Sequence, residues 1–398
     1  MKHKKKLAIM LCAAMLVSAL CGCSPDPVEA PDGAPPDGER QEGAAQEDSA
    51  QAAAEPAPGA EGAGAFDRVD FAAAFAAFPP DAAMLVVDDY TVTWAELFFL
   101  LREDLKTQLD GLSSFPDLSQ SRAGGASYAE RVVENAVGRA LKFRAFEYGI
   151  KLTGFALDES QRSYLEYLVK EMLDSVGDDA RFMELLWENN GLRDLDLFKY
   201  LLYLDYLPYF IFLDLYGNNG EKLSDEDAAR ETEGEGYMVA KHIMRMKDPS
   251  GDLDPLGTIE DILFQLRSYD GDDFAAFFDE LIYEYSDDGG GAYDFPDGYL
   301  FRPGDMEPAF AEACMSLEIG EISGVVESEE GYHIIYRLPV NYDIVPIVQY
   351  GREETDSLRV IVAMGLFEAI TLGWTEALAP AFTSDFLSID ISAIFVEK

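Results

Sequence analysis

Histidine is rare in this sequence, and two of its three copies, His242 and His333, lie in short apolar segments, VAKHIMRM and GYHIIYRL. An imidazole donates and accepts hydrogen bonds and changes charge near neutral pH, so two of them can organise a polar site. Alternation along a strand puts His242 on one face with Ala240 and His333 on one face with Ile335. The pattern therefore predicts that both imidazoles point into the core.

Other chemical signatures are absent from the sequence. It has no glycine-rich phosphate loop ending in Lys-Ser/Thr, no HExxH, no CxxC and no GxSxG. Two histidines and one cysteine beyond the N-terminal region, Cys314, make a poor zinc site, although carboxylates are plentiful. Cys314 has apolar neighbours at helical spacing, which favours a buried structural cysteine over a nucleophile. We therefore expect no metal and no cofactor.

The two histidines frame a run of strands and helices. VAKHIMRM is expected to be a strand, followed by a helix that Thr258 caps and by a second helix in DDFAAFFDELIYEY. After a Gly/Asp loop come a helix that starts near Pro308 and two strands, ISGVVES and GYHIIYRL. This β-α-α-loop-α-β-β order fills about a hundred residues, a normal size for one small α+β domain.

The rest of the folded sequence is mainly helical. It begins near Phe66 with a hairpin that turns at Asp88-Asp89, followed by a helix in which Thr93 is the N-cap and Glu96 completes a capping box. From residue 342, a helix and the alternating, strand-like LSIDISAIF remain, and these two elements cannot bury themselves alone. We expect them to return to the helical body, so that the α+β domain is an insertion in it.

The segment DLDLFKYLLYLDYLPYFIFLDLYG, residues 194–217, is unusually aromatic. Asp205, Pro208 and Asp214 interrupt it, which argues against a transmembrane helix. A core helix is the simpler interpretation. A partly exposed apolar surface for non-native chains is the alternative, and both can hold on different faces of the helix.

The N-terminal region has the pattern of an export signal. Four lysines precede an apolar run, which ends in Leu20-Cys21-Gly22-Cys23 and resembles a bacterial lipobox cleaved before Cys23. Residues 1–22 would be removed, and lipid on Cys23 would hold the protein on the outer face of the membrane. Residues 23–65 contain almost no large apolar side chain and are expected to form an acidic tether. The formal net charge of −45 argues against nucleic acid and anionic lipid as partners.

Residues 237–341 resemble a parvulin-type peptidyl-prolyl isomerase domain. The resemblance rests on motif order: KHIMRMKD, the FA helix and Ser-Asp pair of DDFAAFFDELIYEYSDD, Phe-x-x-Gly-x-Met, Pro-x-Phe, GEIS and GYHII. The lipobox, the hairpin-helix start and the helical halves around the insertion resemble PrsA/SurA-type foldases. The implied fold class is α+β, with a parvulin-type domain (237–341) inserted in a mainly helical chaperone domain formed by 66–236 and 342–398.

The resemblance implies a set of site residues. His242 and His333 match the family's paired core histidines, and Asp288 matches the position that holds Cys or Asp between them. Met306 and Phe310 match the apolar wall that receives the proline ring. Outside this resemblance, Asp288 reads as a solvated loop acid, and Met306 and Phe310 as ordinary core residues. The family's frequent GGDLG loop appears here as FPDGYL, and the scarcity of basic residues after the first strand argues against a phosphoserine preference.

The implied activity is cis–trans isomerisation of X-Pro bonds in unfolded or partly folded secreted proteins, joined to chaperone action outside a bacterial cell membrane. Rotation about such a bond has a barrier of roughly 20 kcal/mol, which a pocket can lower without a covalent intermediate. The alternative class is a non-enzymatic holdase with a low-activity parvulin-like domain. A solute-binding lipoprotein would need two α/β lobes, and the helical body argues against it.

Overall fold

The structure, a computed structural model, describes residues 64–121, 125–289, 293–352 and 355–398. The expected signal peptide, the lipidated Cys23 and nearly all of the tether lie outside these residues. The chain divides into two compact units: unit 1 is Met1–Phe210 with Thr371–Lys398, and unit 2 is Ile211–Ile370. Unit 2 is therefore inserted in the sequence of unit 1. The predicted domain borders at 236/237 and 341/342 do not coincide with the unit borders and stay predictions.

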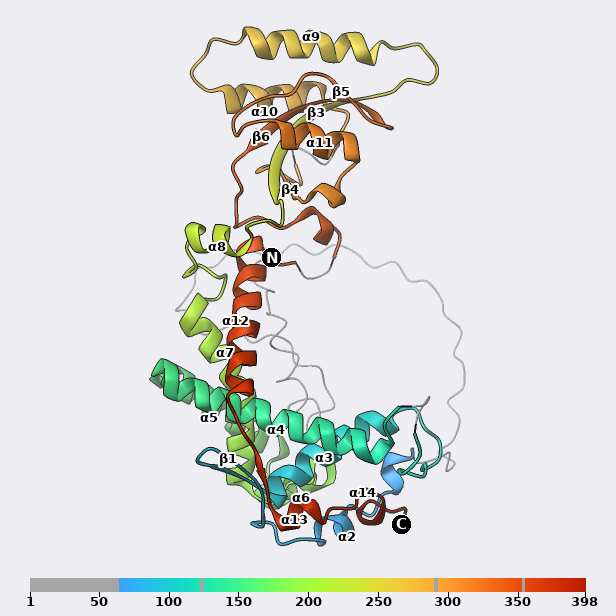
Figure 1. Ribbon diagram of the computed structural model, residues 1–398, viewed down its shortest axis with the longest axis vertical. Coiled ribbons are helices and arrows are strands. Elements are labelled where there is room, and N and C mark those ends of the chain that lie inside the picture. The colour runs from blue at the N-terminus through green and yellow to red at the C-terminus, as the bar shows by residue number, and fades with distance from the viewer. Residues whose placement is uncertain (1–63, 122–124, 290–292, 353–354) are drawn as a thin grey trace, which may run out of the picture. The chain divides into compact units, whose positions relative to one another are not determined.

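Unit 1 is mainly helical (Figure 1). Its first segment holds α2 (Phe71–Phe75), β1 (Ala83–Val87), β2 (Tyr90–Thr93), α3 (Trp94–Leu109), α4 (Tyr128–Thr153), α5 (Glu159–Val176), α6 (Asp179–Asn190) and most of α7 (Leu195–Tyr216). Its second segment holds the end of α12 (Leu358–Glu376), β7 (Ala381–Phe382), α13 (Ser384–Leu387) and α14 (Ile391–Ile394). The predicted hairpin is present, with its turn at Asp88, which has a φ of 53°.

The second segment of unit 1 packs onto the first. β7 pairs antiparallel with β1, giving the strand order β2-β1-β7. The prediction of a strand in LSIDISAIF is wrong, because α13 ends at its first residue, Leu387, and the short helix α14 lies inside it. Thr383 and Asp390 cap these helices, accepting hydrogen bonds from the backbone N–H groups of Phe386 and of Ser392 and Ala393, respectively. Local capping thus outweighs the apolar alternation.

The start of α3 differs in one respect from the prediction. Thr93 is the N-cap and accepts a hydrogen bond from the Glu96 N–H at 3.4 Å. Glu96 is 2% exposed and does not complete a capping box, because its carboxylate accepts hydrogen bonds from Nη2 of Arg144 on α4 at 2.5 and 2.6 Å. Arg144 also bonds to Glu147 and to the Tyr200 hydroxyl. The ion pair joins α3, α4 and α7 through a buried polar cluster.

The aromatic segment forms α7 and lies largely in the core. Tyr206, Phe210, Phe212 and Tyr216 are buried, and the remaining tyrosines of the segment are half-buried. None of the described aromatic side chains of α7 is exposed. The core interpretation fits this burial, and an exposed apolar surface must be sought elsewhere in unit 1.

Unit 2 contains an antiparallel sheet with the strand order β4-β3-β6-β5. Its elements are the end of α7, α8 (Asp225–Glu231), β3 (Met238–Met246), α9 (Pro255–Ser268), α10 (Phe274–Tyr285), β4 (Tyr299–Phe301), α11 (Pro308–Ser316), β5 (Val326–Glu327), β6 (Gly331–Leu338), the 3-10 helix η4 (Ile347–Gln349) and the start of α12. The expected order is present, with β4 in addition. Thr258 is not the cap of α9, because Asp254 caps it one turn earlier, ahead of Pro255.

The two faces of this sheet carry different packing. Helices α9 and α10 lie on one side and α11 on the other (Figure 1). The α9/α10 side buries Ile243, Ile259, Ile262, Leu263, Leu266, Phe278, Leu281, Ile282 and Ile334. The α11 side buries Met238, Ala240, Tyr299, Phe301, Phe310, Ala311, Cys314 and Ile335. Both faces of β3 and β6 are thus covered, so polar groups inside the sheet need internal partners.

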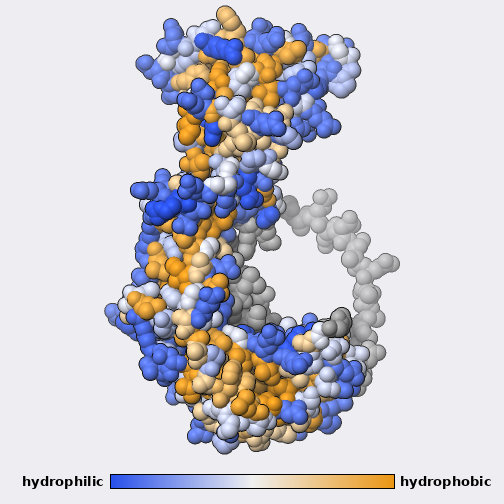
Figure 2. Space-filling view, viewed as in Figure 1, coloured by the Kyte–Doolittle hydropathy of each residue, from blue (hydrophilic) through white to orange (hydrophobic). Residues whose placement is uncertain are grey.

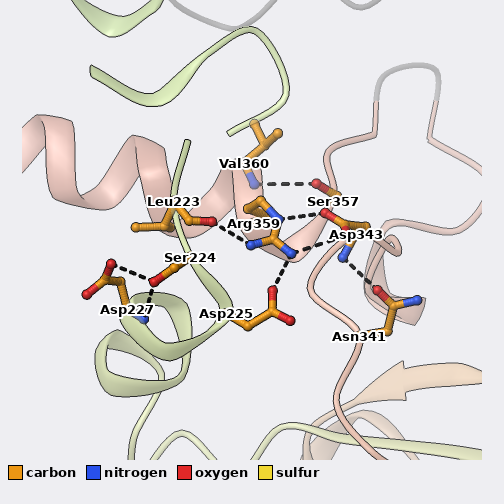
Figure 3. Close-up of polar contacts among 9 residues, drawn as sticks. All are labelled: Leu223, Ser224, Asp225, Asp227, Asn341, Asp343, Ser357, Arg359 and Val360. Atoms are coloured by element: carbon orange, nitrogen blue, oxygen red, sulfur yellow. Dashed lines mark hydrogen bonds and ion pairs between the residues drawn. The ribbon is translucent and has the colours of Figure 1, made fainter. Parts of the chain in front are cut away.

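Helix α12 is, among the described residues, the one helix that is long and apolar enough to cross a membrane. Its first turn carries Arg359, whose side chain bonds to Asp343, Asp225 and the Leu223 carbonyl at 2.6 Å each (Figure 3). The side chains of Asp343 and Asp225 are 68% and 77% exposed. The polar contacts at this end of α12 therefore lie at a solvent-exposed surface.

Candidate active site

His242 and His333 come from neighbouring strands and face each other inside unit 2. In the β3–β6 register, His242 lies opposite Ile335 and His333 opposite Met244. The two Nδ1 atoms are 3.1 Å apart, and the rings are nearly parallel, with an interplanar angle of 18°. Each of the two residues is 6% exposed. Both imidazoles point inward, as the alternation predicts.

Asp288 lies beside His242 because the segment after α10 runs along β3. The Asp287 N–H donates to the Met244 carbonyl, and Ser286 Oγ accepts hydrogen bonds from the N–H groups of Met244 and Asp288. Asp288 Oδ2 is consequently 2.7 Å from His242 Nε2, with its side chain 24% exposed. The structure thus brings the three polar residues of the predicted site together.

Two further polar residues join the site, and the sequence did not indicate them. The Tyr299 hydroxyl lies 2.5 Å from Asp288 Oδ2, and Ser328 Oγ lies 2.7 Å from His333 Nε2. Ser328 is fixed by the turn before β6, where its Oγ accepts a hydrogen bond from the Gly331 N–H at 3.2 Å. Tyr299, Asp288, His242, His333 and Ser328 therefore form one continuous chain of polar contacts.

An apolar wall stands against the histidines. The Phe310 ring meets the His242 and His333 rings edge-on, with centroids 5.2 and 5.8 Å away. Met306 is half-buried and packs against the cluster that contains Phe310. Phe310 thus contacts the polar chain, and Met306 packs against the same apolar cluster as Phe310. Cys23 lies outside the described residues.

Burial decides the charge state of the inner residues. Burial and the nearby His242 lower the pKa of His333 to about 4, against the opposing charges of Glu307 and Asp288. Burial raises the pKa of the Tyr299 hydroxyl, and its hydrogen bond to Asp288 raises it further. At neutral pH, His333 is therefore an uncharged imidazole and Tyr299 a hydrogen-bond donor. Burial also raises the pKa of Cys314, which is fully buried and so remains an unreactive thiol.

The arrangement can orient and polarise a bound group, but the polar chain contains no activated nucleophile of a familiar kind. Serine and histidine are adjacent, yet Ser328 is 6% exposed and tied to the backbone of its own turn. In the parts of the chain that the structure describes, no group of three or more His, Cys, Asp or Glu side chains could hold a metal ion. A polar chain beside an apolar wall suits a reaction that needs shape and hydrogen bonds.

Comparisons with known proteins point to one class of domain. Residues 257–338 match the family model described as the PPIC-type PPIASE domain. The chain is 46% identical over 227 residues to the foldase protein PrsA of Halalkalibacterium halodurans, covering 56% of this chain and 60% of that protein. It is also 46% identical over 69 residues to the chaperone SurA of Chromohalobacter salexigens, covering 17% and 15%.

Among solved structures, PrsA from Bacillus subtilis is 20% identical and covers 69% of this chain and 94% of that one, with a TM-score of 0.24. PrsA from Bacillus cereus is also 20% identical, covers 68% and 95%, and has a TM-score of 0.27.

The chain therefore contains a parvulin-type peptidyl-prolyl isomerase domain within an α+β fold. Its homologues include PrsA and SurA foldases, which confirms the resemblance seen in the motifs. The chain spans less than two thirds of the length of these curated relatives.

Proposed function

We propose that this protein is a peptidyl-prolyl cis–trans isomerase and chaperone that assists the folding of exported proteins at the outer face of the cell membrane. The observation that carries the isomerase half is the buried His242–His333 pair, joined to Asp288 and covered by Phe310. Rotation of an X-Pro bond loses amide resonance midway, so a site that holds the ring and favours the twisted amide lowers the barrier. Neither a cofactor nor a covalent intermediate is needed.

The isomerase proposal is tested with a protease-coupled proline-isomerisation assay on a soluble chain starting at Ser24. Met306→Ala should lower kcat/KM about tenfold, because Met306 lines the wall proposed to receive the proline ring. Met315→Ala is the matched control, since Met315 is a 56% exposed methionine on α11. A wild-type chain without isomerase activity that still suppresses aggregation would support the non-enzymatic holdase instead.

The chaperone half rests on apolar surface in unit 1. Figure 2 shows hydrophobic residues at the surface of the part of the molecule that contains unit 1. Tyr164 and Tyr167 on α5 are 41% and 44% exposed, and Leu152 near the end of α4 is 60% exposed. Such side chains can hold apolar segments of an unfolded client.

Replacing Tyr164 and Tyr167 together by serine should weaken suppression of client aggregation, measured by light scattering. Tyr283→Ser, at a 59% exposed tyrosine in unit 2, is the control.

The two activities should separate when the proposed isomerase domain, 237–341, is replaced by a short Gly/Ser linker. Val239 pairs with Leu338 across β3 and β6, so the chain enters and leaves this domain at neighbouring positions. The contacts of Arg359 lie outside the excised segment. We expect the shortened protein to fold, to suppress aggregation and to lack isomerase activity. If it unfolded, the proposed borders 66–236, 237–341 and 342–398 would be wrong.

Membrane attachment is proposed from the sequence motif alone. The apolar run and the Leu20-Cys21-Gly22-Cys23 ending support cleavage before Cys23 and a lipid on its sulfur. Cys23→Ala should release the protein into the medium or leave it unprocessed, as fractionation and immunoblotting would show. Unchanged recovery of this variant with the membrane would rule out Cys23 as the anchor.

A further inference from the structure

Tyr299 and His242 share one oxygen atom of Asp288. The Tyr299 hydroxyl is 2.5 Å and His242 Nε2 is 2.7 Å from Asp288 Oδ2. The Tyr299 ring also meets the His242 ring edge-on, with centroids 5.4 Å apart. A phenol that contacts a carboxylate donates its proton to the hydrogen bond, so Tyr299 supplies a donor from β4 that supplements the imidazole.

We propose that Tyr299 is a positioning residue of the isomerase site, holding Asp288 so that His242 keeps its proton on Nε2 and His333 keeps its proton on Nδ1. This inference rests on the proposed isomerase function. With His242 donating from Nε2, its Nδ1 is free to accept from His333 Nδ1 at 3.1 Å. His333 Nε2 then accepts from the Ser328 hydroxyl at 2.7 Å. In this arrangement, each polar contact from Tyr299 to Ser328 has one donor and one acceptor.

The same geometry disfavours the reverse arrangement of protons. If His242 carried its proton on Nδ1 instead, its bare Nε2 would face Asp288 Oδ2 at 2.7 Å, placing two lone pairs against each other. Only a proton on Asp288 could relieve that contact. The donor from Tyr299 opposes this, because a hydrogen bond to the charged form of a carboxylate favours that form. Tyr299 thus makes one of two otherwise similar proton arrangements dominant.

A few other charged and titratable groups lie near the polar contacts that run from Tyr299 to Ser328. Asp294, in the loop before β4, and Tyr350, which follows η4, lie near Tyr299. From the start of α11, Glu307 faces His333. On the β3 side, Arg245 is held by Asp287 at 2.8 Å. The Tyr299 hydroxyl contacts Asp288 Oδ2 directly and is therefore a donor to that carboxylate.

Tyr299 is itself held in place by aromatic rings. Phe295 packs on it with ring centroids 4.4 Å apart, and Tyr350 packs on Phe295 at 5.0 Å. The Tyr350 hydroxyl donates to Asp294 at 2.8 Å. Residues 346–350, which lie beyond the matched family segment, also bridge to Leu300 of β4 through Pro346. The positioning residue is therefore supported from outside the core of the domain.

The direct test is to determine by NMR which nitrogen of each imidazole carries the proton. In the full chain labelled with 15N-histidine, only three imidazoles contribute signals. We expect His242 to be protonated on Nε2 and His333 on Nδ1 at neutral pH. Tyr299→Phe keeps the ring and should give mixed tautomers at both histidines, whereas Tyr293→Phe, at a 78% exposed tyrosine in the loop before β4, should change neither. The opposite tautomers in the wild type, or unchanged signals in Tyr299→Phe, would overturn the inference.

The second readout is the pH profile of isomerisation. Tyr299→Phe removes a hydrogen bond to the charged Asp288 carboxylate, so the linked Asp288 and histidine side chains should take up a proton more easily. The acidic limb of kcat/KM should therefore move up by about one pH unit in this variant. Tyr293→Phe should keep the wild-type profile. An active wild type with the same acidic limb in Tyr299→Phe would refute the role of Tyr299 while leaving the isomerase intact. An inactive wild type would refute the proposed function, and the tautomers would still decide the placement of Tyr299.

Discussion

The buried cluster around Arg144 makes a quantitative prediction about unit 1. Arg144 carries one positive charge and contacts two glutamates, Glu96 and Glu147, while the Tyr200 hydroxyl donates to Glu147 at 2.8 Å. Two acids and one base leave an excess negative charge in a place where Glu96 is 2% exposed. Burial is the main cause that raises the pKa of Glu96 to about 7, although Arg144 opposes it.

The raised pKa of Glu96 makes its contribution to the free energy of unfolding larger at acidic pH than at alkaline pH. The folded value of Glu96, about 7, lies above its ordinary value of 4.5, so the folded state binds the proton more tightly. Its contribution to the free energy of unfolding is complete below pH 4.5 and disappears as the pH rises through 7. Between pH 5.5 and pH 8 the loss amounts to about 2 kcal/mol. Glu96→Gln cannot titrate, so the unfolding free energy of this variant should lack that loss.

The assay uses the tryptophans. All three of them, Trp94, Trp187 and Trp374, belong to unit 1, so their fluorescence follows the urea unfolding of that unit. Measurements at pH 5.5 and pH 8 stay above the sequence pI of about 4.1. The other carboxylates are common to both proteins and cancel in the comparison. Glu134→Gln, at an exposed glutamate on α4, should keep the wild-type pH dependence. The reasoning fails if Glu96→Gln loses as much stability as wild type between the two pH values.

Two further predictions concern packing. His242→Ala and His333→Ala should each lower the unfolding free energy of unit 2 by roughly 1–3 kcal/mol, because the remaining imidazole loses its buried partner, and each should slow isomerisation. Near-UV circular dichroism of the tyrosines would follow this; melting like wild type would contradict it. Gly149→Ala on α4 would put a Cβ 2.4 Å from the Trp374 ring and should destabilise unit 1 by about 1–3 kcal/mol. Gly138→Ala on the same helix meets nothing within 4 Å and should stabilise it slightly, so equal effects on urea unfolding would refute the packing argument.

Local sequence patterns were sufficient where a single interaction decides the structure. The strand positions of His242 and His333 follow from apolar alternation, and Thr93 caps α3 as its type and place predict. The errors arose where two local rules competed. LSIDISAIF alternates like a strand, yet Asp390 caps a short helix, α14, within it. Glu96 sits correctly for a capping box, but a buried arginine 48 positions away binds it more strongly.

In the site, likewise, local sequence patterns identify the histidines but not Tyr299 and Ser328, whose roles depend on contacts made by folding. Histidine occurs three times in the chain and tyrosine twenty times, so a histidine in an apolar strand stands out while Tyr299 does not. Nothing near Tyr299 in the sequence indicates that its hydroxyl meets Asp288, because β4 reaches that position only through its pairing with β3. Ser328 is likewise selected by the turn that Gly331 closes. Rare residues can thus locate a site from sequence, but the common residues that fix its protons are identified only when the strands are placed side by side.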